Sequence, residues 1–124
     1  MRAATLEFVN NRILSLGLPY SFMEWAEYPP DDYFVGQYIE NPSPTRTENG
    51  HQKTTFILRG YTSGSWLNLE TYKEKIEKGI STTAILDDGT GVAIFYDSAM
   101  VVPTGVAGWK SIKINLNIQE WKVN

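Results

Sequence analysis

The C-terminal part of the chain alternates between apolar and polar residues, and this alternation constrains the fold more than any other feature. Over residues 111–122, four apolar residues occupy every second position: Ile112, Ile114, Leu116 and Ile118. We expect Trp121 to extend the same apolar face. A period of two indicates a strand that is buried on one face only, which is typical of an antiparallel sheet.

Two amphipathic helices are predicted elsewhere in the chain. The first spans residues 3–16, where apolar residues recur every three or four positions, and we expect Gly17 to end it. The second spans residues 68–78 and carries one apolar face and one charged face. Within it, Glu74 and Lys78 have the spacing of a favourable ion pair on a helix surface.

The remaining segments predict strands. A short strand begins at Tyr20 and is followed by a turn cluster of Pro and Asp. Tyr33–Glu40 and Lys53–Tyr61 are rich in aromatic and β-branched residues, so we expect them to pair as an antiparallel hairpin. Thr82–Leu86 and Val92–Tyr96 flank an Asp-Gly turn and predict a second hairpin.

These elements predict an α+β fold. We expect a single antiparallel or mixed β-sheet with two α-helices packed on one face and a long loop between central strands. A length of 124 residues, of which 42% are hydrophobic, suits one domain over 1–124 with one core. The net charge of −3 argues against general nucleic-acid binding, and the absence of Cys excludes disulfides and thiolate metal sites.

Catalytic and metal-binding groups do not form a convincing set in the sequence. The single histidine, His51, lies in a polar segment where nothing would orient its ring for a catalytic triad. Asp31 and Asp32, and likewise Asp87 and Asp88, are adjacent residues in turns, where carboxylates usually cap backbone amides. We therefore expect a protein that is not an enzyme, with no cofactor and no metal.

The Gly-rich piece GYTSGSW precedes the second helix and superficially resembles an anion-binding loop. It lacks the lysine and the spacing of a phosphate-binding P-loop. We expect Ser65 or Asn68 to cap the helix instead.

Charges are unevenly distributed along the chain. No Lys or Arg occurs between Ile13 and Thr45, while this region contains five carboxylates: Glu24, Glu27, Asp31, Asp32 and Glu40. Positive charge follows later, at Arg59, Lys110 and Lys113. An acidic and a basic surface on one domain suit head-to-tail contact between copies. The alternative is that these charges only keep the surface solvated.

The segment Asn41–Gln52 (NPSPTRTENGHQ) is longer than a usual hairpin loop and contains no large apolar residue. Loops of this length in small domains are often functional, so we interpret it as a contact arm. Its candidate contact residues are Thr45, Arg46, Asn49 and His51.

Aromatic residues are abundant, with four Trp, seven Tyr and five Phe. They are expected mainly in a core and an oligomer interface. They also leave open a second function, a small carbohydrate- or peptide-binding module without catalysis.

The order of segments along the whole chain resembles a known family. An N-terminal helix is followed by GLPYSFMEW, YFVGQYIE, a polar loop, TTFILRGYT, a helix after SWLNLE, DDGTGVAIFYDSAMVVPTG and SIKINLNIQEWKV. This string is similar to the small tail terminator proteins, also called tail-to-head joining or tail completion proteins, of siphophages and of prophages in low-GC Gram-positive bacteria.

The resemblance implies a structural virion protein that terminates tail-tube polymerisation. Its partners would be further copies of itself in a hexameric ring, the major tail tube protein and the head-completion (stopper) protein. DNA would pass through the ring without sequence-specific contact, and no membrane would be involved. The expected location is the head-proximal end of the tail, after assembly in the host cytoplasm.

Overall fold

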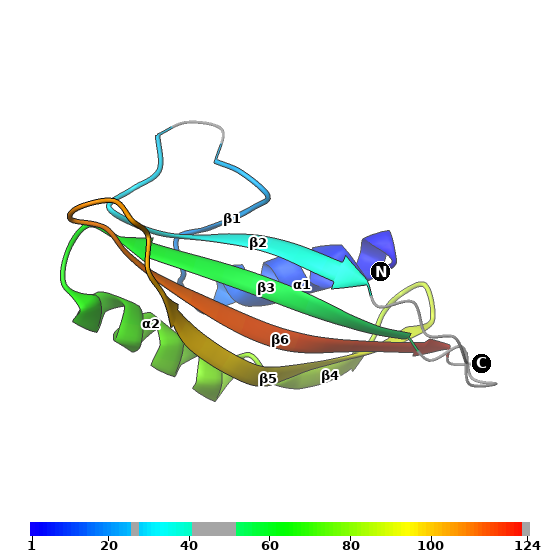
Figure 1. The fold of residues 1–124 in the computed structure, drawn as a ribbon. Coiled ribbons are helices and arrows are strands. Elements are labelled where there is room, and N and C mark those ends of the chain that lie inside the picture. Colours follow the sequence, from blue (N-terminus) through cyan, green and yellow to red (C-terminus); the bar gives the residue numbers. More distant parts are fainter. Residues whose placement is uncertain (26–27, 41–51, 123–124) are drawn as a thin grey trace.

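The structure is a computed structural model that describes residues 1–25, 28–40 and 52–122. These residues form two helices and six strands: α1 (Ala3–Ser15), β1 (Tyr20–Phe22), β2 (Asp32–Glu40), β3 (Gln52–Thr62), α2 (Trp66–Gly79), β4 (Thr82–Ile85), β5 (Thr90–Val102) and β6 (Lys110–Lys122). All six strands belong to one sheet with the order β1-β2-β3-β6-β5-β4 (Figure 1).

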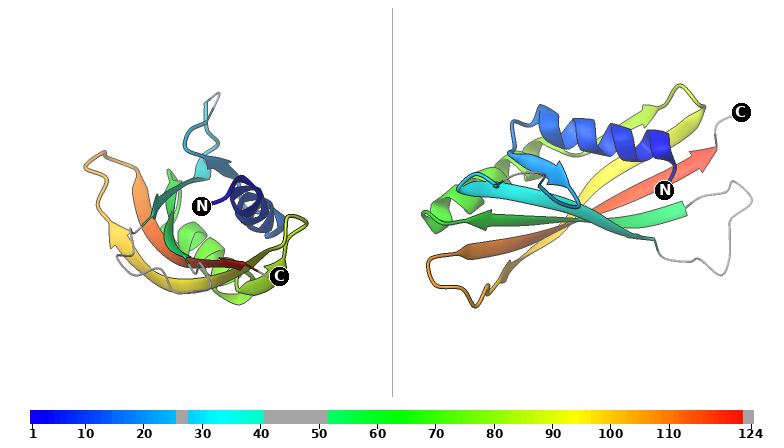
Figure 2. Two further views of the ribbon diagram at one scale, coloured as in Figure 1. Left: turned by 90° about the vertical axis from the view of Figure 1, so that its right-hand side faces the viewer. Right: turned by 90° about the horizontal axis from the view of Figure 1, so that it is seen from above.

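The sheet is mixed, because β1 runs parallel to β2 while the other neighbouring pairs are antiparallel. It curls into a half-barrel, and both helices pack against the same face of it (Figure 2). The predicted α+β fold with one sheet is therefore confirmed. Of the predicted loop Asn41–Gln52, only Gln52 is described, as the first residue of β3.

The core lies between the helices and the sheet. Its fully buried side chains come from one stripe of each helix and from alternate positions of the strands: Val9, Ile13, Phe34, Phe56, Leu58, Leu69, Ile76, Ile80, Val92, Ile94, Ile114, Leu116 and Ile118. The alternation predicted for the C-terminal strand is confirmed, because its four apolar residues from Ile112 to Ile118 all face the helices.

Trp121 does not extend this apolar face, so that prediction was wrong. A strand has a period of two, so residue 121 points away from the side occupied by residues 112–118. The ring of Trp121 covers Gly91 of β5 instead, where an added Cβ would lie 2.2 Å from the indole. The core-facing position next to it belongs to Glu120, which is only 4% exposed.

Both helices end close to the predicted residues. α1 ends at Ser15, and Gly17 adopts the left-handed φ of +81° that glycine permits at such a position. α2 begins two residues earlier than predicted because Ser65 caps it: the Ser65 hydroxyl accepts a hydrogen bond from the Leu67 N–H at 3.2 Å.

The ion pairs on α2 differ from the expected one. Lys73 pairs with Glu70 at 2.8 Å and contacts Glu77 at 4.0 Å, whereas Glu74 and Lys78 do not pair. Lys73 lies within reach of a carboxylate on both neighbouring turns, so it is the lysine that forms the pairs on this helix.

The two predicted hairpins are confirmed. β2 and β3 pair antiparallel with Phe34 opposite Gly60, and the Phe34 ring fills the space that a Cβ at Gly60 would occupy. In the β4–β5 turn, Gly89 has a φ of +84°, and the Asp88 carboxylate accepts a hydrogen bond from the Thr90 N–H at 2.9 Å. β5 continues past the predicted end, through a bulge, to Val102.

Candidate functional site

The face of the sheet opposite the helices is turned toward the reader in Figure 1, and we call it the outer face. It consists of the odd-numbered residues of β2, β3 and β6 together with their partners on β5, which are Gly91, Ala93, Phe95, Ser98, Met100 and Val102. Three large apolar side chains on it are about half exposed: Ile39 (53%), Phe95 (44%) and Met100 (55%). A solvated sheet face is normally polar, so this one has the composition of a contact surface.

The outer face also carries positive charge. Arg59 of β3 lies directly opposite Lys113 of β6, and Lys53 occupies the same face further along β3. The outward positions of β2, β3 and β6 contain no Asp or Glu. Neither Arg59 nor Lys113 forms a hydrogen bond or ion pair within the described part of the chain. The structure thus brings together two of the three basic residues that the sequence indicated.

Aromatic side chains cluster at the end of the outer face where β2 begins. The rings of Tyr33 and Tyr61 stack at 5.0 Å between centroids, and Trp109 packs edge-on against Tyr33 at 6.1 Å. Trp25 contacts Tyr33 from another side, also at 6.1 Å. Burial, with the nearby Tyr61 hydroxyl as a smaller cause, raises the pKa of Tyr33 above its ordinary value.

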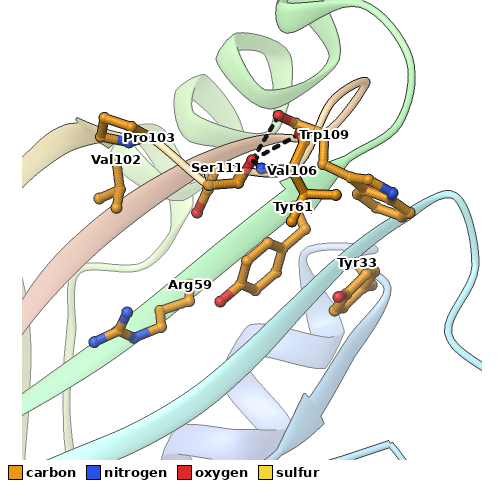
Figure 3. A pocket seen from close by; sticks show the side chains of 9 residues that line it. Tyr33, Arg59, Tyr61, Val102, Pro103, Val106, Trp109 and Ser111 are labelled. Atoms are coloured by element: carbon orange, nitrogen blue, oxygen red, sulfur yellow. Dashed lines mark hydrogen bonds between the residues drawn. The ribbon is translucent and has the colours of Figure 1, made fainter.

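These rings form one wall of a pocket of about 410 Å³. Its other residues are Arg59, Val102 and Ser111 on the strands, and Pro103, Thr104 and Val106 in the connection from β5 to β6. Figure 3 shows the three rings on one side and the Arg59 guanidinium beyond Tyr61. The volume falls within the range of small ligand sites, and the mixture of rings and one cation is typical of such sites.

The β5–β6 connection that closes the pocket is fixed by one side chain. The Thr104 hydroxyl accepts a hydrogen bond from the Val106 N–H at 3.1 Å and can donate to the Trp109 carbonyl at 3.0 Å (Figure 3). Gly105 and Gly108 adopt positive φ values of 71° and 83°, which permit the tight course of this loop. These hydrogen bonds and the conformation of the two glycines therefore fix the position of Trp109.

A second charged element lies at the β1–β2 edge of the sheet, at the same end as the β5–β6 connection that closes the pocket (Figure 1). We call residues 28–31 the acidic segment, Tyr28-Pro29-Pro30-Asp31. Tyr28 is 99% exposed, and Asp31 is exposed as well. The Asp31 carbonyl accepts a hydrogen bond from the Ser63 N–H at 3.1 Å, which fixes one end of the segment. Glu24, further back, is also exposed.

Asp32 and Lys110, unlike Arg59 and Lys113, form hydrogen bonds with neighbouring residues that the structure describes. Asp32 accepts a hydrogen bond from the Thr62 hydroxyl, and Lys110 donates to the Gly64 carbonyl at 2.9 Å. Both are opposite Thr62 in the sheet register. Because 110 and 113 differ by an odd number, Lys110 cannot share a strand face with Lys113. We therefore exclude Lys110 from the basic surface.

The other predicted contacts fall elsewhere. Glu40 pairs with the amino group of Met1. Glu27 and the loop residues Thr45, Arg46, Asn49 and His51 lie outside the described residues.

Sequence reasoning missed Trp109 and Glu120. Trp109 sits in a loop with no periodic pattern, so nothing local marked it. Glu120 could have been found from the alternation, which places it on the buried face. Its carboxylate accepts hydrogen bonds from the Thr5 hydroxyl at 2.7 Å and the Arg2 N–H at 3.1 Å.

Within the described ranges, His, Asp and Glu side chains form no group of three that could hold a metal ion. Neither of the helices described is long and apolar enough to cross a membrane.

Comparisons with known proteins inform the fold only. No family model matches the chain, and no curated protein matches it. One solved protein, whose name carries no functional description, is similar in structure with a TM-score of 0.61. The match covers 99% of this chain and 90% of that protein at 13% sequence identity. At this identity the similarity concerns the architecture, which the two chains share over nearly their full length.

Proposed function

We propose that this chain is a structural phage protein that terminates tail-tube polymerisation and forms the ring joining the tail to the head-completion protein. Two lines of reasoning support the proposal: the resemblance of the whole sequence to tail terminator proteins and the character of the outer face. The observation that carries most weight is that face: half-exposed Met100 lies opposite Lys113, which is itself opposite Arg59, and half-exposed Ile39 and Phe95 lie further along the same face.

A ring imposes a specific requirement on its subunits. Each copy must present two different surfaces that fit each other, because a head-to-tail interface closes into a ring only when the contacts are heterologous. This chain offers such a pair: a basic, partly apolar outer face and an acidic segment at the sheet edge. The tube protein and the head-completion protein would contact the surfaces that remain.

Deletion of the gene from its phage or prophage tests the proposal. We expect electron microscopy of the lysate to show filled heads and tails that are not joined, and expression of the protein from a plasmid should restore joined particles. Normal virions in the deletion strain would overturn the proposal.

The pocket supports a second candidate function, a small carbohydrate- or peptide-binding module. Tyr33, Tyr61 and Trp109 offer ring surfaces on which a sugar or a peptide side chain can stack. Under this alternative, addition of an oligosaccharide should change the intrinsic fluorescence of Trp109. A ring subunit should not respond to sugars.

A further inference from the structure

The aromatic pocket combines two kinds of recognition group. The rings of Tyr33, Tyr61 and Trp109 form one side, and the Arg59 guanidinium lies beyond Tyr61 (Figure 3). Lys113 faces Arg59 across the strand pair. Like charges directly opposite each other destabilise a sheet, so an anion placed over this pair would be favourable. The matching ligand has an aromatic or prolyl part next to a carboxylate.

The acidic segment has this chemistry in the right order. Tyr28 exposes 99% of its surface, which is unusual for so large a ring. Pro29 and Pro30 follow it, and Asp31 supplies an exposed carboxylate. Two consecutive prolines favour an extended polyproline conformation, and such segments typically bind grooves lined by aromatic side chains. Their stiffness reduces the entropy that is lost on binding.

We propose that the aromatic pocket of one copy binds the acidic segment of a second copy. Tyr28 and the prolines would pack against Tyr33, Tyr61 and Trp109, and Asp31 would lie over Arg59 and Lys113. This inference rests on the proposed function, because ring assembly is the reason for taking the partner to be another copy of the chain.

The segment does not occupy the pocket of its own chain. With Tyr28 almost fully exposed, its ring contacts none of the pocket rings. The C-terminal end of the segment is fixed by the hydrogen bond from the Ser63 N–H to the Asp31 carbonyl. In Figure 1 the chain that leads into β2 rises from the β1–β2 edge of the sheet. The pocket opens on the outer face, to which its strand residues Tyr33, Arg59 and Tyr61 belong. Because the two surfaces face different directions, each can contact a different neighbour, as a ring requires.

A peptide-binding experiment tests the pocket directly. A capped peptide with the sequence of residues 28–31, Tyr-Pro-Pro-Asp, is titrated into the ¹⁵N-labelled full chain and followed by NMR. We expect shifts concentrated at Tyr33, Tyr61 and Trp109. Arg59→Glu should weaken binding at least about tenfold, since it replaces an attraction by a repulsion. A peptide with Ala in place of Tyr28 should bind at least about tenfold more weakly, as expected for an aromatic anchor.

Lys53→Glu is the matched control, because it makes the same charge change on the same face of the same strand. Lys53 lies six residues from Arg59, or about 20 Å at about 3.3 Å per residue, beyond the screening length at physiological salt. We expect it to change affinity by less than about threefold. Absence of peptide-induced shifts, or equal loss with both variants, would overturn the inference.

Exchange of the two charges tests whether the contact joins two copies. The variants Asp31→Arg and Arg59→Asp are mixed in equal amounts. In the mixture, residue 31 of each variant can bind a pocket of opposite charge on the other variant, whereas in each variant alone the two charges are alike. We expect sedimentation velocity to show each variant alone less associated than the mixture. Association of either variant alone to the same extent as the mixture would overturn the inference. Peptide binding does not depend on phage assembly, so its failure is distinguishable from failure of the deletion experiment.

Discussion

Replacement of Glu120 tests how α1 is attached to the sheet. Arg2 is the N-cap of α1 and forms no side-chain capping bond. The Glu120 carboxylate, which comes from β6, accepts hydrogen bonds from the Arg2 N–H and the Thr5 hydroxyl at this helix end. A carboxylate at this position accepts hydrogen bonds as a capping residue would, and it also interacts favourably with the positive end of the helix dipole. This explains why a charged residue occupies a buried position.

The expected magnitude follows from these contacts. Glu120→Gln keeps an acceptor of the same shape but loses the charge, so we expect a loss of about 1–2 kcal/mol in the free energy of unfolding. Glu120→Ala removes the acceptor and leaves the buried Thr5 hydroxyl and the partly buried Arg2 N–H without a partner, so the loss should be about 2–4 kcal/mol. The free energy of unfolding should therefore be highest for the wild type, lower for Glu120→Gln and lowest for Glu120→Ala.

Urea denaturation followed by circular dichroism measures these differences. Gln119→Ala is the control, because residue 119 is the neighbour on the outer face and should change stability by less than about 0.5 kcal/mol. If Glu120→Ala were as stable as Gln119→Ala, the carboxylate would not fix the helix and the reasoning would be refuted.

Three further outcomes are expected. Gly60→Ala should lower the free energy of unfolding by about 1–3 kcal/mol, since its Cβ would lie 2.4 Å from the buried Phe34 ring; Phe34→Leu in the same chain should recover part of the loss, and additive losses in urea melts would contradict this. Burial raises the pKa of Tyr20 above its ordinary value of 10.0, so the stability of the neutral phenol is present below pH 10 and is lost as the pH rises above it. Tyr20→Phe loses the hydrogen bond to the Asn10 side chain and should be less stable at neutral pH, but its free energy of unfolding, from urea melts followed by circular dichroism, should fall less steeply above pH 10; an equally steep fall would argue against this. Replacement of residues 42–50 by a short Gly-Ser linker should leave the thermal midpoint nearly unchanged, because loop length affects stability weakly, yet abolish tail joining; an unfolded domain would show that the loop is structural, and normal joining would show that the contact arm lies elsewhere.

The elements of the fold were predictable because each has a local signal. Helical spacing marked α1 and α2, and the period of two in β6 showed which residues face the core. The same period contradicts two of the predictions from the sequence. Trp121 is odd-numbered and cannot share a face with Ile112–Ile118, and Lys110 is even-numbered and cannot share a face with Lys113.

The pocket was not predictable in the same way. Tyr33, Tyr61 and Trp109 come from β2, β3 and a loop, and they meet only because β3 pairs with both β2 and β6. A single sequence contains no local signal for such long-range contacts. The proximity of Arg59 and Lys113 likewise depends on the register of β3 and β6, which alternation alone does not set.

The length and attachment of tails in a deletion strain test the central claim most directly. Electron microscopy of lysates with and without the gene would measure, for each particle, the tail length and the presence of a head. The proposed function predicts tails of variable length without heads in the deletion strain, and tails of uniform length joined to heads after complementation. Tails of uniform length joined to heads in the absence of the gene would contradict it.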